Sequence, residues 1–590
     1  MFMSTLPAEM DHMIFFVVEN MNRGTRLIDD PDLKYEVSQL NLQAGEKAVA
    51  ASAFHSAAEY LSRGISLLGP ESWAIKYDLT IRLYDAASEA LVVTGDFPRL
   101  SELIDEPLTN ARSFEDKLNI LNNFVRALSA SSKFEKGIAK CMSILSQLGE
   151  WFPAEVTADV YTEELAQVKQ VLCGKTRQDF LSLPKMSDTR KLAAMQFMNH
   201  ALLMGFNTQP KLNIVIVFRM VRMSIEHGMC NVSAFAFACY GTLLVNVPFS
   251  DVEGGHSMGR VACEMTEKLG AVEMIPRLYA SVYGFINIWK EPWQAGLSKH
   301  LEAYESGSKT GDIEYATINL YQYVNKATFG CGENLESLSK NIQLYAKRAF
   351  QCNQHNGWKI MAVLHQLTLD LMGEKQNAFS ACSISMTEDS CFEATRDNHE
   401  TTLCRLFAYK KKFVAFFTGQ LVEAANMYEL CQEYPIESGG RLVSALVNVF
   451  IDGLIGFFFA RKHQADEAKW TTLGTDAIRS LREWVGNSGW NFSNKLYLLE
   501  AEHYFLKEDD ERALLCYDAS IKAAREHRFV HEEGLAEEKL ATYLLNKNRH
   551  EEGMEHFVGA KKCYEAWGAR SLVRRVDNVI GILLPVCKGT

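Results

Sequence analysis

The chain has 590 residues, with 61 Lys and Arg against 73 Asp and Glu, which gives a formal net charge of −12. This acidic balance argues against a protein that coats nucleic acid. Hydrophobic residues make up 47% of the chain and only 13 residues are proline, so the composition excludes wholesale disorder and favours a large, helical, folded protein.

The N-terminal segment lacks the features of a targeting peptide. Glu9 and Asp11 stand where a secretory signal needs positive charge, and the apolar run at 13–18 is too short. The 14 cysteines are scattered without a C-x-x-C pair, as is typical of free thiols in a reducing compartment. We therefore expect a cytoplasmic protein.

Helical hairpins are expected from the first residues onward. At 45–64, 86–104, 121–141 and 413–428, a short turn separates two segments that carry apolar residues at helical spacing. Strand patterns are nearly absent. The β-branched run at 212–218 leads directly into helical spacing, so we predict a helix there as well.

Two units near the C-terminus show the repeat most clearly. The first has large, small and aromatic residues at the spacing of a tetratricopeptide repeat: Tyr497, Ala501, Tyr504, Ala513 and Tyr517. About 40 residues further on, Ala541, Gly553 and Phe557 take the places of Ala501, Ala513 and Tyr517. Small residues let the two helices of a hairpin approach closely, and the acidic run at 508–511 suits a helix N-terminus.

These patterns predict an all-α fold, an α-solenoid of tetratricopeptide-like helical hairpins that forms a right-handed superhelix. We expect 1–379 to be its N-terminal part, 380–399 an irregular loop or linker, and 400–590 the C-terminal repeats that continue the same solenoid. The run at 442–459 is apolar enough to suggest a membrane span, but small or polar residues, Asp452 among them, recur every four positions. We interpret it as a buried helix and expect no membrane span.

Patterns for nucleotide binding and catalysis are incomplete. In the segment 306–311, Ala303 and Ser308 occupy two positions where a phosphate-binding loop needs glycine, so we interpret the segment as a solvated inter-hairpin loop. The sequence contains neither G-x-G-x-x-G nor G-x-S-x-G. We therefore predict no catalytic residue and no cofactor.

Metal-site patterns are also incomplete. His527 and His531 are four residues apart beside two glutamates, but arginines stand among them and disfavour a bound cation. The run at 550–556 is two residues too long for a zinc-protease helix, and Cys382 and Cys391 have no histidine between them. We therefore predict no metal.

Three adjacent lysines, Lys410, Lys411 and Lys412, lie in the apolar-periodic segment 406–417. We interpret them as a solvated helix face. The alternative is a basic patch that binds a phosphorylated or acidic segment of a partner.

Aromatic and apolar residues near helix ends are the other candidates for contacts. We interpret five tryptophans mostly as core or inter-repeat residues: Trp289, Trp293, Trp484, Trp490 and Trp567. The apolar run at 14–18 lies almost at the N-terminus, where a solenoid end needs a polar outer face. We therefore expect the N-terminal hairpin to dock onto another domain or to self-associate.

Three blocks, 17–68, 186–241 and 523–576, resemble the helical-repeat region of large signalling proteins of the signal-transduction ATPase class. The most specific matches are FVHEEGLA at 529–536 and YEAWGA at 564–569. In that family a kinase-like domain and an AAA-type ATPase module typically precede the repeats, and a GAF domain with a histidine kinase or cyclase domain often follows them. The resemblance implies a signalling context.

Three functions remain open at this point. The first is a non-catalytic interaction or sensor scaffold that binds a protein or peptide, possibly ATPase or kinase domains in trans, along a superhelical groove. The second is a fragment of a larger ATP-dependent serine/threonine or histidine kinase receptor whose catalytic domains are absent from this chain. The third is a structural scaffold with several constitutive partners.

Overall fold

The computed structural model describes residues 13–205, 208–246, 249–380, 386–435, 441–462 and 466–588, with 584–588 described by their backbone alone. Within these ranges every regular element is a helix, and a single parallel bridge joins Lys185 to Met229. The all-α expectation is confirmed, and the run at 212–218 lies in helix α13 (Pro210–His227). The right-handed tetratricopeptide superhelix stays a prediction.

The chain divides into two compact units. The first comprises Met1–Gly174 and Leu183–Val232, and the second comprises Lys175–Ser182 and Ser233–Thr590. This division differs from the expected stretches 1–379 and 400–590, because helices on both sides of the expected linker pack into one interior.

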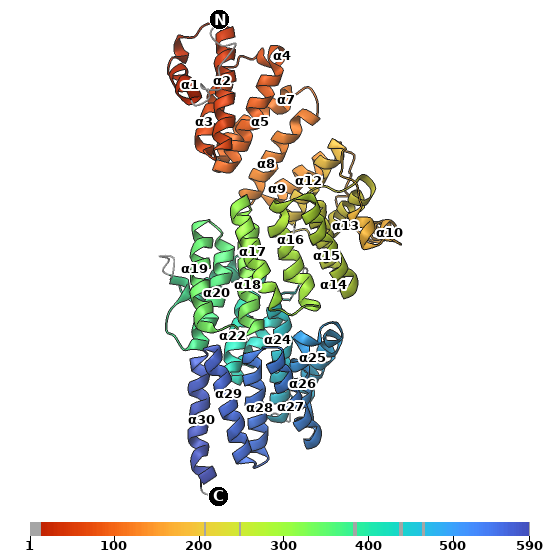
Figure 1. Ribbon diagram of the computed structural model, residues 1–590, viewed down its shortest axis with the longest axis vertical. Helices are drawn as coiled ribbons and strands as arrows, with labels where there is room; N and C mark the ends of the chain where they lie inside the picture. The colour runs from red at the N-terminus through yellow and green to blue at the C-terminus, as the bar shows by residue number, and fades with distance from the viewer. Residues whose placement is uncertain are drawn as a thin grey trace. The chain divides into compact units, whose positions relative to one another are not determined.

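The first unit is a series of short helical hairpins (Figure 1). Its α-helices are α1 (Ile14–Arg23), α2 (Pro31–Ala50), α3 (Phe54–Ser66), α4 (Ser72–Ile75), α5 (Tyr77–Thr94), α6 (Phe97–Leu103), α7 (Asp105–Asn110), α8 (Leu118–Ala130), α9 (Phe134–Gln147), α10 (Ala158–Leu172), α12 (Thr189–Gly205) and α13. Helices α2 and α3 approach closely at Gly45, where an added Cβ would lie 2.5 Å from Cγ of Leu61. The small residue therefore permits the close packing that the hairpin pattern predicts.

Helix α1 covers part of the apolar N-terminal run. Ile14 and Val18 are buried against Leu40 and Ala44 of α2, whereas the Phe16 side chain points outward and is 66% exposed. Within the run at 14–18 the unit buries Ile14 and Val18, partly covers Phe15 and Val17, and leaves Phe16 exposed. Docking or self-association of this hairpin stays a prediction.

The second unit has an inner and an outer layer of helices that alternate along the chain. The inner helices are α14 (Ser233–Val245), α16 (Ile275–Ser281), α18 (Ile313–Lys326), α20 (His355–Met372), α22 (Thr401–Phe417), α24 (Val443–Lys462), α26 (Gly489–Leu506), α28 (Val530–Asn546) and α30 (Arg570–Lys588). The outer helices are α15 (Val252–Leu269), α17 (Ala295–Thr310), α19 (Leu335–Gln351), α21 (Glu388–Asp397), α23 (Leu421–Gln432), α25 (Glu467–Asn487), α27 (Asp510–Glu526) and α29 (His550–Trp567). The short helix α11 (Arg177–Leu181) packs beside α15.

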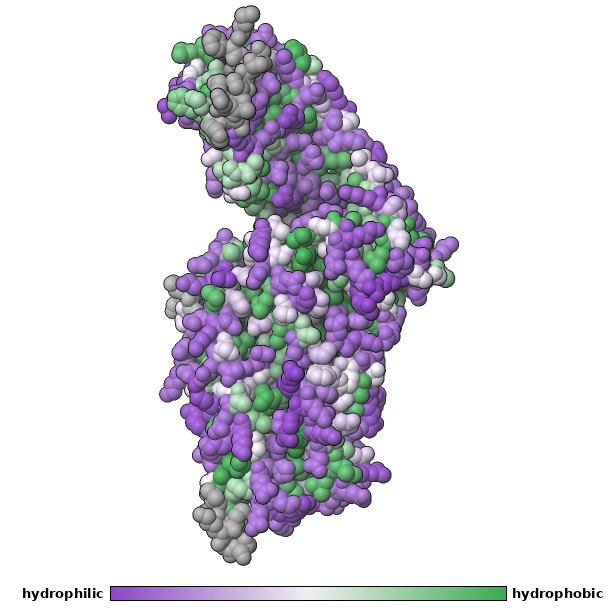
Figure 2. Space-filling view, viewed as in Figure 1, coloured by the Kyte–Doolittle hydropathy of each residue, from purple (hydrophilic) through white to green (hydrophobic). Residues whose placement is uncertain are grey.

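The two layers differ in how their helices are buried. Outer helix α19 buries one stripe at helical spacing, Leu335, Leu338, Ile342, Ala346 and Ala349, and leaves its other face polar. Hydrophilic residues accordingly cover most of the face shown in Figure 2, with separate hydrophobic patches between them. Inner helices such as α20 are buried on all faces, as the continuous buried run 361–369 shows. Helix α30 differs, because among its described side chains it buries only Leu572 and Val576.

Helix α24 is the inner helix that corresponds to the apolar run at 442–459. Within the described residues it is long and apolar enough to cross a membrane, and 78% of that stretch is buried inside the fold. Contacts with α22, α25 and α26 surround it, so its composition follows from its place in the inner layer.

The hairpin turns of the C-terminal region repeat at a fixed interval. Glu508, Arg528, Asn548 and Gly568 are the left-handed residues that end four successive helices, with φ of 59°, 61°, 59° and 86°. After each, the next amide donates to the carbonyl five residues earlier, as from Phe529 to Ala524 at 2.8 Å. This Schellman geometry lets each helix turn back onto its predecessor (Figure 1).

The array of hairpins folds back so that distant repeats meet. The turn at 288–293 rests on Asn491 at the start of α26, with sequence separations of 198 to 203 residues in its hydrogen bonds. The Leu371 carbonyl accepts from Ser571 of α30 at 2.6 Å across a separation of 200 residues. Hairpins five repeats apart therefore touch, which a simple open solenoid does not predict.

Two expected loops are helical. The predicted linker 380–399 contains α21, whose start is capped by Thr387 and Ser390; residues 381–385 of it lie outside the described part of the chain. The segment 306–310 is the last turn of α17, and Gly311 ends that helix in a left-handed conformation. The interpretation of 306–311 as a solvated loop is wrong, because its serines and lysine continue the helix without breaking it.

Candidate functional site

Five ion pairs connect consecutive inner helices of the second unit from α20 to α30. They are Asp370–Lys410, Lys412–Asp452, Arg461–Glu502, Lys495–Glu532 and Glu538–Arg575, and we call this set the ion-pair ladder. The nitrogen–oxygen distances are 2.6 Å in the first pair, 2.5 Å in the second, 2.7 Å in the fourth and 2.6 Å in the last. All five pairs join residues 37 to 41 positions apart, the length of one hairpin.

The ladder places charges where water is largely excluded. The Lys412 and Lys495 side chains are 0% and 1% exposed, and their carboxylate partners are held in the same interior. Burial raises the pKa of Asp452, although Lys412 opposes that shift. Burial likewise lowers the pKa of Lys495, and Glu532 opposes it. Each pair therefore offsets part of a desolvation cost that either charge alone would carry in full.

Aromatic rings and hydroxyls complete the ladder. The Lys495 ammonium lies 4.7 Å from the ring centroid of Trp293 and 4.4 Å from that of Phe529, in cation–π geometry. Burial alone would raise the pKa of Glu502, but Arg461 and the Tyr517 hydroxyl, which donates at 2.7 Å, hold it below its usual value. These contacts pair the buried charges within the protein, although Oε1 of Glu532 and Nε of Arg575 have no hydrogen-bond partner among the described residues.

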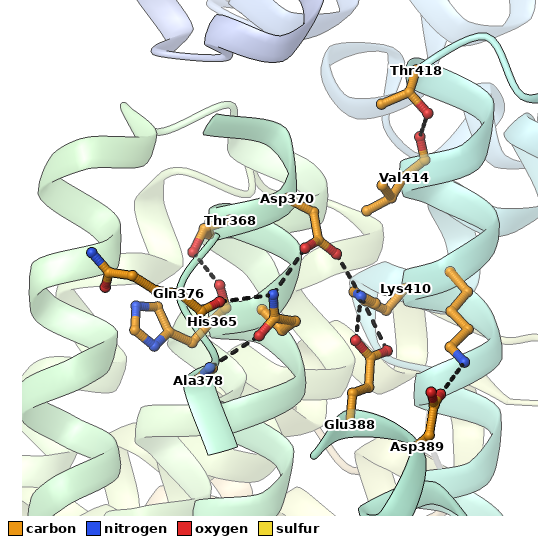
Figure 3. A network of polar contacts seen from close by, with 12 residues as sticks. His365, Thr368, Asp370, Gln376, Ala378, Glu388, Asp389, Lys410, Val414 and Thr418 are labelled. Carbon is orange, nitrogen blue, oxygen red and sulfur yellow. Dashed lines mark hydrogen bonds and ion pairs between the residues drawn. The ribbon is translucent and has the colours of Figure 1, made fainter. Parts of the chain in front are cut away.

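The N-terminal rung of the ladder is a branched network (Figure 3). The Lys410 ammonium donates to Glu388 of α21 at 2.8 and 3.0 Å and pairs with Asp370 of α20 at 2.6 Å. Asp370 in turn accepts from the side-chain amide of Gln366 at 2.9 Å, and Lys411 pairs with Asp389 at 3.2 Å. One lysine thus joins two inner helices and one outer helix.

The structure corrects both interpretations of the lysine run. Lys410 and Lys412 are buried, with side chains 5% and 0% exposed, and only Lys411 lies partly in solvent. They are neither a solvated face nor an open basic patch, because α22 is an inner helix whose neighbours supply a carboxylate to each. The spacing of 40 residues between Lys412 and Asp452 was the sequence signal that could have revealed the pair.

A second buried basic group lies at the end of α18, beside α17 and the π-helical turn Val282–Ile286. Lys326 donates to the Tyr283 carbonyl at 2.8 Å and contacts Nε2 of His300 at 3.2 Å, and burial lowers its pKa to about 8. It ends α18 just before a π-helical turn, Ala327–Cys331. A cavity of about 10 Å³ beside it, lined also by Glu291 and Trp293, has room for at most one water.

The histidines considered as metal ligands have structural surroundings instead. His531 is buried beside Trp567, with ring centroids 5.2 Å apart, while His527 stacks on Trp490 at the hairpin turn. Within the described part of the chain, no group of three or more His, Cys, Asp or Glu residues could hold a metal ion. Cys382 lies outside the described residues, and Cys391 is buried.

Four of the five tryptophans occupy the interior, as the sequence predicts. Trp289, Trp293, Trp484 and Trp567 are buried, and Trp293 fits between Phe492 and Phe529 at centroid distances of 5.5 and 6.0 Å. Trp490 is 37% exposed. The predicted capping role of the acidic run is confirmed, since Asp509 accepts from the Arg512 amide at 3.2 Å.

Comparison with known proteins finds a partial similarity to a signalling protein. No protein-family model matches the chain. The chain is similar to "Hybrid signal transduction histidine kinase G" of Dictyostelium discoideum, with 22% identity over 340 residues, which covers 52% of this chain and 10% of that protein. The chain thus spans about a tenth of the length of this relative. The resemblance to kinase signalling proteins is supported, whereas an ATPase or tetratricopeptide family is not matched.

Proposed function

We propose that this chain is a non-catalytic protein-interaction module of a signal-transduction kinase system. The observation that carries the proposal is the similarity of about half the chain to a hybrid histidine kinase. The two-layer helical fold supports it, because a stack of hairpins presents a long surface to other proteins. The ion-pair ladder supports it further, since paired charges on successive helices hold each hairpin in register with the next.

We place the partner on the outer layer of the second unit rather than along an inner groove. Inner helices such as α20 and α24 are buried on all faces by other helices and leave their side chains no solvent-facing stripe. The outer helices carry polar faces that a protein or peptide can contact, including ATPase or kinase domains in trans. With a net charge of −12, we favour such a cytoplasmic partner over nucleic acid.

Phosphoryl-transfer and cross-linking measurements test this proposal. Purified chain incubated with Mg²⁺ and radiolabelled ATP should acquire no label and release no phosphate, and labelled chain would contradict the non-catalytic assignment.

In cells of the source organism, amine cross-links to kinase or ATPase domains should start from exposed outer-layer lysines such as Lys522 and Lys562. Buried Lys412 is the internal control, and cross-links confined to metabolic or ribosomal proteins would count against a signalling role.

The alternative is that the sequence is a segment of a longer kinase receptor, as the short span relative to the Dictyostelium protein suggests. An antibody against 523–576 distinguishes the two. A band near 66.5 kDa supports a stand-alone module, and a much larger band supports the receptor.

The N-terminal hairpin is a proposed site of self-association. Among its described residues, Leu27, Phe16 and Met13 are exposed large apolar side chains, at 87%, 66% and 48% exposure. Replacing Phe16 with Glu should shift sedimentation equilibrium toward monomer, whereas a chain that is monomeric at all concentrations before the change removes this proposal.

A further inference from the structure

Helix α21 is the shortest of the outer helices, and only α23, with 12 residues and two buried side chains, is similar to it. It has 10 residues, against 17 in α19 and 21 in α25, and only Cys391 and Thr395 are buried. It packs on α22, while the inner helices α20 and α22 contact each other directly beneath it. The core of the second unit is therefore continuous behind α21.

Acidic residues fasten α21 at its first turn, as Figure 3 shows. Glu388 and Asp389 pair with Lys410 and Lys411, and the Asp389 side chain is 84% exposed. One turn later the Phe392 ring meets Phe407 of α22 edge to face, with centroids 5.5 Å apart. A mostly exposed ion pair contributes little, about 0.2–1 kcal/mol. The docking of α21 therefore depends on Glu388, on the buried side chains of Cys391 and Thr395, and on the contact of Phe392 with Phe407.

Asp370 and Lys410 beneath α21 have partners on α20 and α22 that do not depend on α21. Lys410 keeps Asp370 as a carboxylate partner at 2.6 Å, and Gln366 holds Asp370 in place. The same Gln366 accepts from the Ala378 amide at 3.0 Å, which fixes the loop that carries Phe379 against Phe407. Because one ammonium faces two carboxylates, removal of Glu388 leaves a balanced pair rather than an isolated buried charge.

We propose that this surface, the α21 site formed by Asp370, Phe379, Phe407, Lys410 and Lys411, binds an acidic amphipathic helix of a partner protein. Helix α21 is its resident competitor. The ligand chemistry follows from α21 itself: two adjacent carboxylates in the first helical turn reach the lysines, and an aromatic residue four positions after the first carboxylate meets Phe407. The inference rests on the proposed function and names the class of partner. At this one position the partner would reach the inner helices α20 and α22, because it takes the place of an outer helix.

A peptide-binding experiment tests the α21 site on the full chain. The probe is a fluorescent peptide of residues 386–399 with Cys391 replaced by Ala, and its binding is followed by anisotropy. The chain variant E388Q/D389N, which loosens α21 and leaves the α21 site unchanged, should bind the probe at least about tenfold more tightly than the original chain. The matched control is Glu393→Gln, at an exposed α21 position, which should bind like the original chain.

Two further measurements keep the proposal falsifiable. Adding Lys411→Met to E388Q/D389N should lower the affinity of the chain for the probe again. A peptide with the same residues in scrambled order should bind to E388Q/D389N at least about tenfold more weakly than the probe does. Equal binding of the scrambled peptide would show a non-specific cation surface and overturn the proposal. Amide hydrogen exchange should show α21 opening well before α20 and α22, and exchange of all three helices only on global unfolding would also overturn it. None of these readouts involves a kinase, so their failure leaves the proposed function intact.

Discussion

At the residue scale, the ion-pair ladder accounts for charges that look misplaced in the sequence. Asp452 lies in a stretch that is long and apolar enough to cross a membrane, and Lys412 lies in an apolar-periodic helix. Their side chains meet at 2.5 Å between α22 and α24, so each provides the counter-charge that the other needs. The two anomalies have one cause.

Replacement of Lys412 with Met should destabilise the protein by about 3–5 kcal/mol, because Asp452 is left as an uncompensated buried charge. The double variant K412M/D452L should recover most of that loss. Urea unfolding followed by circular dichroism measures both values. Lys411→Met is the control and should cost about 1 kcal/mol or less. A double variant as unstable as K412M would refute the pairing argument.

Lys326 should make stability depend on alkaline pH. Its folded-state pKa of about 8 lies below the ordinary value of 10.5, so between these values the unfolded chain binds a proton that the folded chain does not. The contribution of Lys326 to the free energy of unfolding therefore rises with pH between about 8 and 10.5. The stability difference between the original chain and Lys326→Met should move in favour of the original chain as pH rises from 7.5 to 9.5. A difference that is flat with pH would contradict the burial of Lys326.

At the scale of the element, the turns set the geometry of the hairpins. Arg528 and Asn548 take left-handed conformations where Gly568 stands in the next turn, at φ of 61°, 59° and 86°. The left-handed region costs a residue with a Cβ about 1 kcal/mol relative to glycine. The interval of 20 residues between these turns is what makes the two layers alternate.

Turn substitutions should therefore change stability in opposite directions. Arg528→Gly relieves the left-handed strain and should stabilise the fold by up to about 1 kcal/mol, whereas Gly568→Ala should cost about 1–2 kcal/mol. The expected cost of Gly568→Ala does not come from a steric clash, since an added Cβ at position 568 would lie no closer than 3.4 Å to any neighbouring atom. Thermal unfolding of both variants measures the shifts. Equal effects of the two changes would argue against the Schellman turns.

At the scale of the whole second unit, hairpins five repeats apart contact each other, so the hairpins do not form a simple open array. Asn491 illustrates this, because its amide donates to the carbonyls of Ile288 and Glu291 and its oxygen accepts from the Trp293 amide. One side chain thus satisfies a turn that lies some 200 residues earlier in the sequence.

Asn491→Ala should destabilise the protein by about 2–4 kcal/mol, because it leaves buried backbone groups of the 288–293 turn without partners. Amide exchange should accelerate in that turn as well as at the start of α26. Asn546→Ala is the control, since the Asn546 side chain is exposed and donates only to Thr542 in its own helix. Acceleration confined to α26 would contradict the contact between distant repeats.

The sequence by itself determined the helical class, the hairpin turns and the repeat of about 40 residues, because these depend on local spacing of apolar, small and turn residues. It also identified the interior position of α24 and of most tryptophans. Only the tertiary structure decided that Lys410 and Lys412 are buried, that α21 forms within the expected linker, and that distant hairpins meet. Burial of a charge depends on a partner one repeat away, and contacts across some 200 residues leave no local pattern for sequence to show.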